Sequence, residues 1–140
     1  MEYCSHIWGG SGSSSLLDRV ESKAIRLINC PLLSNSLDPL SLRRDVGALS
    51  LFYRYYNGRC SRELASHTTP PLRRPRCIRG DLLSHEFCVD EGNPRLARCG
   101  ASFFPATSVL WNSLSSSIFP PVFNLPLIKA SVCAHLRGVR

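Results

Sequence analysis

This sequence of 140 residues lacks several features that mark enzymes, membrane proteins and secreted proteins. It contains no G-x-S-x-G, H-E-x-x-H or Walker glycine loop, so the common hydrolase, zinc-protease and phosphate-binding motifs are missing. No apolar run reaches about eighteen residues, which argues against a membrane-spanning helix. The first residues show no charged segment followed by an apolar one, so we expect an intracellular chain, cytoplasmic or nuclear, that is not secreted.

Metal-binding cysteine pairs are also missing, because none of the seven cysteines forms a C-x-x-C motif. The best zinc candidates are Cys77, His85, Cys88 and Cys99, of which only His85 and Cys88 are as closely spaced as a zinc knuckle requires. We therefore expect no cofactor and no metal, with thiols in a reducing compartment. A small zinc-stabilised interaction module is the alternative.

Lysine is scarce, since fifteen of the seventeen basic residues are arginine, and the net charge is +7. Residues 54–79 contain seven arginines and one glutamate, a net charge of +6 in that window. Arginine binds phosphate in a bidentate way and stacks on bases, so this bias favours an RNA or DNA backbone as the partner. A solvated loop is the simpler alternative. The candidate residues are Arg54, Arg59, Arg62, Arg73, Arg74, Arg76 and Arg79.

Two helices are predicted in the first half of the chain. The first covers residues 16–29, where a basic row of Arg19, Lys23 and Arg26 flanks an apolar stripe. That row is either an ordinary solvated face or a phosphate-binding ridge. The stripe consists of Leu17, Val20, Ala24, Leu27 and Ile28.

The second helix is predicted over residues 38–56, with Asp38 as its N-cap and Asn57–Gly58 as its left-handed end. Apolar and aromatic residues spaced alternately by four and three positions predict a seam, a face of this helix that packs on another helix. Its members are Leu42, Val46, Leu49, Tyr53 and Tyr56. Tyr53, Tyr55 and Tyr56 beside Arg54 are either core residues or a platform for stacking bases, and Tyr55 is expected to be exposed because it lies off the seam.

The second half begins with a basic arm, because three prolines interrupt residues 68–80. Residues 84–90 and 95–103 flank a turn and predict a β-hairpin. Ser102 and Pro105 then start a helix, whose expected buried face is Phe103, Leu110, Trp111 and Leu114. In a closing helix the apolar stripe is Leu125, Ile128, Val132 and Leu136.

The expected fold is therefore mainly α with a small β-hairpin (α+β), with three to four helices joined by loops rich in proline and arginine. We expect a helical segment at residues 1–66 with a flexible linker at 9–15, a basic arm at 67–83, and a C-terminal segment at 84–140. As a piece of a larger protein it can be incomplete as an independent fold, with apolar faces left uncovered.

The order of these motifs resembles jockey-like non-LTR retrotransposon reverse transcriptases in the region that follows the polymerase palm. Residues 102–114, SFFPATSVLWNSL, are similar to that family's S-F-F-P-R-T-x-x-L-W-N-S-L. Residues 2–8 and 17–28 resemble its L-E-Y-x-S-x-x-W and L-[DE]-x-V segments, and residues 40–46 and 51–56 its L-x-x-R-R-D and F-Y-[KR]-x-Y motifs. The resemblance spans nearly the whole chain.

Four positions depart from the family pattern. Ala106 stands in place of arginine, Ser115 in place of proline, and Ile128 in place of phenylalanine. Met1 replaces an internal residue, so we expect either a 5′-truncated element copy or a partial gene model that lacks the endonuclease and the palm. The resemblance implies that the first two helices pack beside a palm and guide the template and primer backbone.

Polymerases of this family bind two metal ions through adjacent aspartates, and this sequence has no Asp-Asp pair. Its one adjacent acidic pair, Asp90–Glu91, falls in the predicted hairpin turn. We therefore expect a non-catalytic C-terminal fragment of an RNA-directed DNA polymerase that contributes binding to element RNA or target DNA. An inert retroelement remnant is the alternative.

Overall fold

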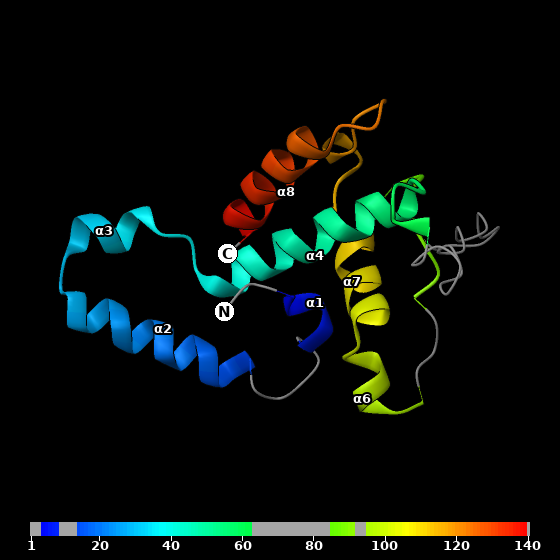
Figure 1. Cartoon of the computed structure of the whole chain (residues 1–140). Helices are drawn as coiled ribbons and strands as arrows, with labels where there is room; N and C mark the ends of the chain where they lie inside the picture. Colours follow the sequence, from blue (N-terminus) through cyan, green and yellow to red (C-terminus); the bar gives the residue numbers. More distant parts are fainter. Residues whose placement is uncertain (1–3, 9–13, 63–84, 92–94, 140) are drawn as a thin grey trace.

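The computed structural model describes residues 4–8, 14–62, 85–91 and 95–139 of the chain. This part is mainly helical, as predicted, and no β-strand forms within it. Helix α4 (Leu40–Tyr56) lies at the centre, with α8 (Leu125–Val139) on one side and α7 (Phe103–Asn112) crossing it on the other (Figure 1). Each helix in the described ranges is too short or too polar to span a bilayer.

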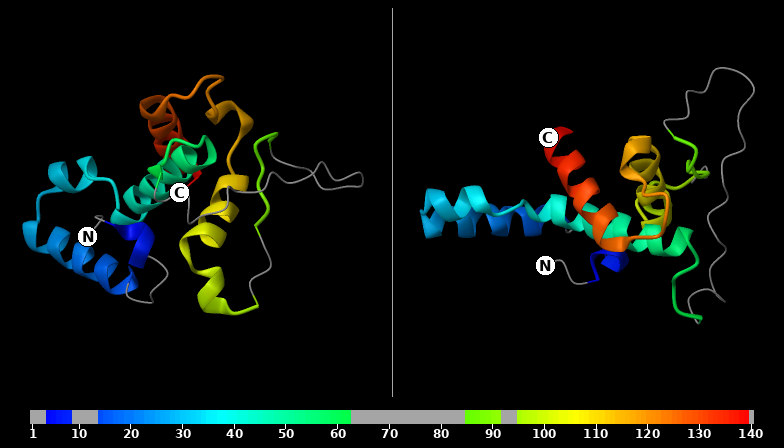
Figure 2. Two further views of the ribbon diagram at one scale, coloured as in Figure 1. Left: turned by 45° about the vertical axis from the view of Figure 1, so that its right-hand side comes forward. Right: turned by 90° about the horizontal axis from the view of Figure 1, so that it is seen from above.

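The remaining helical elements are short, apart from one long helix near the N-terminus. Helix α2 and the short α3 that follows it extend beyond the first turn of α4, away from α7 (Figure 2). The bounds are α1 (Ser5–Trp8), α2 (Ser14–Ile28), α3 (Pro31–Ser36), α6 (Ala97–Gly100) and the 3-10 turn η1 (Ser116–Ile118).

The core forms where α4, α7 and α8 meet. Both predicted stripes are confirmed: Leu42, Val46, Leu49 and Tyr53 of α4 are buried, and so are Ile128, Val132 and Leu136 of α8. Tyr56 and Leu125 are half-buried against them. These residues follow the three- and four-residue spacing that places side chains on one face of a helix.

Trp111 lies at the centre of this core, with 1% of its surface exposed. Its ring centroid is 5.1 Å from that of Phe52 and 4.8 Å from that of Phe119. The predicted buried face of α7 is therefore confirmed, since Leu114 is also fully buried and both Phe103 and Leu110 pack against the cluster. Aromatic rings in such tilted and edge-on contacts stabilise a core beyond their buried area alone.

Helix α4 begins differently from the prediction. Asp38 is not its N-cap: the N-cap residue is Pro39, and no side chain of the cap residue bonds the helix. The carboxylate of Glu21 in α2 instead accepts the N–H of Leu40, at 2.9 and 3.1 Å to its two oxygens. Asp38 is held by Arg137, whose Nε donates to Oδ1 at 2.8 Å. The cap therefore comes from another helix and satisfies a donor that α4 itself cannot.

Two other helix ends, the C-terminal end of α4 and the start of α7, agree more closely with the prediction. Helix α4 ends at Asn57–Gly58 as expected, and Gly58 has the left-handed φ of +65° that glycine accommodates without strain. Ser102 occupies the N-cap position of α7, with Pro105 in the first turn, but the Ser102 hydroxyl donates to the carbonyl of Cys99 and accepts no N–H of α7.

The predicted β-hairpin is wrong for the residues that the structure describes. Residues 97–100 form α6, and Phe103 already belongs to α7, so the expected second strand is helical. Val89 is an isolated β-bridge residue and not part of a strand, and its own N–H and C=O are both bonded by the side chain of Asn112 at 2.9 Å. Asn112 therefore bonds both backbone groups of Val89.

The predicted first and third segments share one core, since α4 packs on both α7 and α8. The basic arm predicted at residues 67–83 lies outside the described residues, as do most residues of the predicted linker. The segment boundaries therefore remain a prediction, while the helical pieces on either side of the arm pack together.

Candidate functional site

Three of the predicted nucleic-acid-binding arginines lie where α4 ends. Arg54, Arg59 and Arg62 are all exposed. The chain turns back at Gly58, so that the N–H of Arg59 donates to the carbonyl of Arg54 at 2.8 Å. The ion pairs of the described part, Arg44–Asp18 and Arg137–Asp38, involve other arginines. These three guanidinium groups therefore face solvent and pair with no carboxylate in that part of the chain.

Arg59 is positioned by an aromatic ring. Its guanidinium carbon lies 5.6 Å from the centroid of Phe123, which in turn stacks on Tyr53 at 5.0 Å. A guanidinium at this distance is attracted by the ring face and keeps its outer N–H groups available. The turn after α4 is therefore tied to the segment before α8, which orients Arg59.

The other four predicted arginines, Arg73, Arg74, Arg76 and Arg79, lie outside the described residues, as does the zinc candidate Cys77. Their role remains a prediction from the sequence.

The expected exposed stacking platform is wrong for Tyr55, which is only 8% exposed. Its ring centroid lies 5.0 Å from that of Phe104 in α7. Tyr53 is buried as well, and its hydroxyl accepts the N–H of Asn124 at 3.2 Å. Helix α4 is covered from two sides, so a tyrosine off the main seam still meets a neighbour. Bases cannot stack on either ring in this arrangement.

His85 is buried, and its ring is hydrogen-bonded to backbone groups. Its Nδ1 accepts the N–H of Phe87 at 3.2 Å, so its Nε2, 3.0 Å from the carbonyl oxygen of Trp111, is the donor. Burial lowers the pKa of His85, although its hydrogen bond to the Trp111 backbone opposes that shift. Both ring nitrogens are thus engaged.

The other zinc candidates differ in their surroundings. Cys88 is buried and Cys99 is exposed. Among the residues described, no group of three or more histidine, cysteine or acidic side chains lies close enough to hold a metal ion. Zinc binding by the full set would need Cys77, which the structure does not describe.

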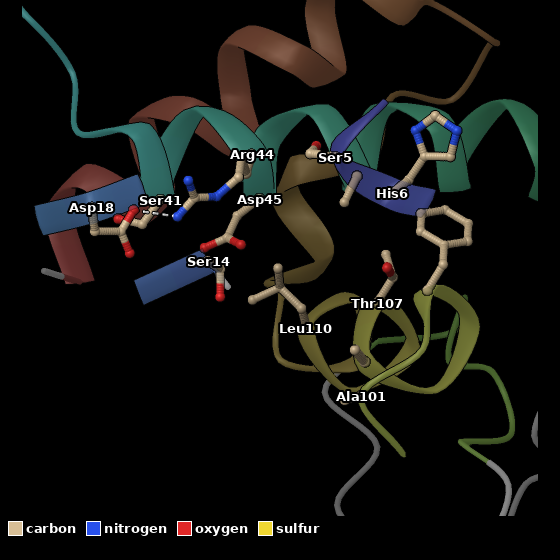
Figure 3. Close-up of a pocket in the computed structure, with 13 residues that line it drawn as sticks. Ser5, His6, Ser14, Asp18, Ser41, Arg44, Asp45, Ala101, Thr107 and Leu110 are labelled. Carbon is tan, nitrogen blue, oxygen red and sulfur yellow. Dashed lines mark hydrogen bonds and ion pairs between the residues drawn. The ribbon is translucent and has the colours of Figure 1, made fainter. Parts of the chain in front are cut away.

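A cleft of about 350 Å³ opens between α1, α2, α4 and α7, a volume at the lower end of small-ligand sites (Figure 3). Asp18, Arg44 and Asp45 form its polar end, while Phe103 and Leu110 line its apolar end. Arg44 is largely buried, and its Nη2 pairs with Asp18 while its Nη1 has no acceptor among the described residues.

Sequence reasoning did not single out this cleft, although a signal was present. Ser41, Arg44 and Asp45 belong to the stretch that resembles the L-x-x-R-R-D motif, and all three line the cleft. The exposed arginines at the end of α4 do not line it. The cleft and the basic end of α4 are therefore separate features.

The described part thus offers exposed guanidinium groups, which suit phosphate, and a core held by aromatic rings. Comparisons with models of protein families, with curated proteins and with solved structures found no match for this chain.

Proposed function

We propose that this chain is a non-catalytic nucleic-acid-binding region, similar to the part of jockey-like retrotransposon reverse transcriptases that follows the palm. The observation that carries the proposal is the exposure of Arg54, Arg59 and Arg62 at one end of α4. They are the first three of the seven arginines in residues 54–79, a window with a net charge of +6. Such a density of arginine favours contact with a phosphate backbone.

The proposal assigns no polymerase activity to this chain. Two-metal catalysis needs carboxylates that hold both ions, and the sequence contains no adjacent aspartates. Asp90 is exposed, and the carboxylate of its neighbour Glu91 accepts a hydrogen bond from Asn112 at 2.8 Å. Glu91 therefore supports the fold in this arrangement.

Binding should depend mainly on charge and little on sequence. The buried positions of Tyr53 and Tyr55 remove the stacking contribution that exposed tyrosines would have supplied. Arg54, Arg59 and Arg62 lie at the end of a helix and in the turn after it, and three prolines interrupt the predicted arm, so we expect no rigid helical frame of the kind that reading base edges requires. The proposed partner is thus the RNA or DNA backbone, and in a longer protein the palm would lie beside the first helices.

A charge-matched pair of variants tests this proposal. The test variant replaces Arg54, Arg59 and Arg62 by serine, and the control replaces three other exposed basic residues, Arg43, Arg95 and Lys129. Both lose the same charge, so a general electrostatic effect weakens both equally. We expect fluorescence anisotropy with labelled single-stranded RNA and DNA to show markedly weaker binding by the test variant. Equal binding by the two variants, or no binding by the parent, would favour an inert remnant.

A further inference from the structure

Helix α2 presents an apolar stripe to solvent. None of its residues is buried. The exposed fractions are 55% for Leu16, 51% for Val20, 77% for Leu27 and 53% for Ile28. We call these four residues the α2 stripe; Leu32 of α3, 84% exposed, lies just beyond its end. A contiguous apolar row of this kind is typical of a surface that binds a partner.

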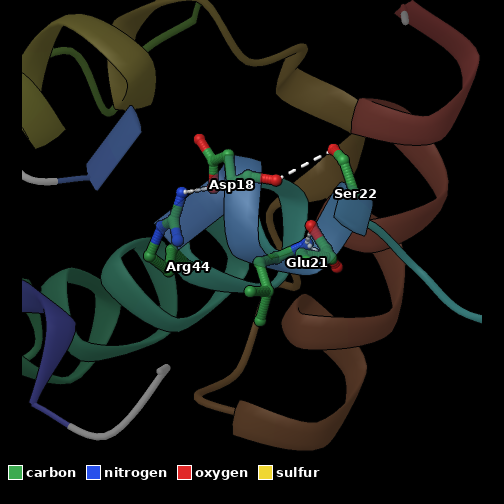
Figure 4. Close-up of polar contacts among 5 residues, drawn as sticks. Asp18, Glu21, Ser22 and Arg44 are labelled. Carbon is green, nitrogen blue, oxygen red and sulfur yellow. Dashed lines mark hydrogen bonds and ion pairs between the residues drawn. The ribbon is translucent and has the colours of Figure 1, made fainter. Parts of the chain in front are cut away.

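The stripe is exposed because α2 is attached to α4 through a polar edge (Figure 4). Asp18 pairs with Arg44, and Glu21 accepts the N–H of Leu40 at 2.9 Å. With about 3.6 residues per turn, these two carboxylates lie on a different sector of the helix from Leu16, Val20 and Leu27, and Ile28 lies between the two sectors beside Glu21. Anchoring that sector to α4 therefore turns the apolar residues away from the core.

A basic row borders the stripe on the side away from α4. Arg19, Lys23 and Arg26 are all exposed, and the Nε of Arg26 donates to the carbonyl of Ser22 at 3.3 Å. The same helical geometry places the row next to Leu16 and Leu27. An occupant lying along the stripe would therefore meet positive charge along one edge and α4 along the other.

We propose that the α2 stripe, where no palm covers it, docks an amphipathic helix of another protein whose Asp or Glu side chains face Arg19, Lys23 and Arg26. Charge complementarity carries the choice of occupant: apolar residues would cover the stripe while carboxylates meet the basic row. The proposal is independent of the arginine window after α4.

Two other occupants fit less well. A second copy would bring together chains of net charge +7 and, in an antiparallel helix pair, would oppose one basic row to the other. An anionic membrane would favour basic residues on both flanks of the stripe, whereas the second flank here carries Asp18 and Glu21 and is packed on α4.

The test uses the full chain and two synthetic amphipathic peptides of about 20 residues, identical except that one carries glutamate and the other lysine along one edge of its apolar face. We expect the glutamate peptide to bind at least about tenfold more tightly in calorimetry. Replacing Arg19, Lys23 and Arg26 together by glutamate should reverse this preference. Measuring both peptides against the parent and the glutamate variant distinguishes a specific charge contact from non-specific binding.

A second pair of variants tests the apolar part. Val20→Ser with Leu27→Ser should weaken the glutamate peptide about tenfold, while Val122→Ser with Val139→Ser, at sites 75% and 72% exposed elsewhere, should leave its affinity unchanged. All four side chains are exposed, so both variants should remain folded. Equal binding of the two peptides to the parent would overturn the proposal.

Two further results would also overturn it. The first is failure of the glutamate peptide to bind while vesicles with about 30% phosphatidylserine retain the chain through the α2 stripe, which would make the stripe a membrane surface. The second is self-association in analytical ultracentrifugation that Leu27→Ser abolishes, which would make it a contact between copies of this chain.

Discussion

Asn112 holds the backbone of Val89 with both ends of its side-chain amide. Its Oδ1 accepts the N–H of Val89 and its Nδ2 donates to the carbonyl of the same residue, each at 2.9 Å. Beside it, the indole of Trp111 donates to the carbonyl of Phe87 at 2.9 Å. Two neighbouring residues of α7 therefore hold residues 87–89 against the core.

This contact predicts that Asn112→Ala is strongly destabilising. The substitution leaves the N–H and the C=O of Val89 without partners at a residue that is fully buried, and we expect a loss of about 2 to 4 kcal/mol. Asn112→Asp should also destabilise the fold, because it keeps the acceptor but removes the donor to Val89 and places a charge near Glu91.

Urea denaturation would measure both Asn112 variants against Asn124→Ala. Asn124 accepts the N–H of Leu127 at 3.0 Å in the first turn of α8, so its loss should cost only about 1 kcal/mol. If Asn112→Ala were no more destabilising than Asn124→Ala, the amide would not support Val89 as described.

The central position of Trp111 gives a second stability prediction. Trp111→Ala should reduce the free energy of unfolding by about 3 to 5 kcal/mol, because it removes the largest fully buried side chain and the donor to Phe87. Trp111→Phe should cost less, since it keeps part of the ring contacts. An unchanged denaturation midpoint for the alanine variant would contradict the central role of this ring.

His85 makes stability depend on pH. Because burial lowers its pKa below the ordinary 6.5 in the folded chain, the unfolded chain binds a proton at a higher pH than the folded one. The free energy of unfolding should therefore fall as the pH drops through about 6.5 toward the lower pKa of the folded state.

The contribution of His85 can be separated from that of other groups. His85→Gln cannot titrate, so its stability should change less between about pH 7.5 and pH 5.5 than that of the parent, even if it is less stable throughout. The three other histidines, His6, His67 and His135, are present in both proteins and cancel in the comparison. Identical slopes in the two proteins would remove His85 as the source.

Zinc should neither bind tightly nor be required for folding. Both ring nitrogens of His85 are used within the protein, and Cys99 is exposed while Cys88 is buried. Metal analysis of the purified chain should find far less than one zinc per molecule, and chelation should leave the circular dichroism spectrum unchanged. About one zinc per chain, with loss of structure on chelation, would reverse this expectation.

Periodicity predicted the parts of the fold that depend on a single buried face. The spacing of Ile128, Val132 and Leu136 identified the inner face of α8, and the corresponding spacing in α4 identified its contact with α8. These residues are buried because their own helix determines which of them lie together. The local sequence pattern is therefore sufficient to identify the buried face of each helix.

The features that the sequence did not predict correctly depend on tertiary contacts, which a local sequence pattern does not contain. Tyr55 is buried because Phe104 packs on a second side of α4. The cap of α4 comes from Glu21, nineteen residues earlier in the chain. Val20, Leu27 and Ile28 were recognised as members of an apolar stripe, but only the anchoring of Asp18 and Glu21 to α4 determines that they face solvent together with Leu16.

Charge-driven binding by the arginine window is the central functional claim, and its salt dependence tests it most directly. With roughly four to six phosphate contacts, log K should fall against log salt with a slope of about −3 to −5. Replacing Arg73, Arg74, Arg76 and Arg79 by serine should weaken RNA and DNA alike and reduce the slope by up to about four units. The measurement is a salt titration by fluorescence anisotropy on both proteins. No binding by the parent at about 50 mM salt, or a fourfold variant that binds with the same affinity and slope as the parent, would contradict the account.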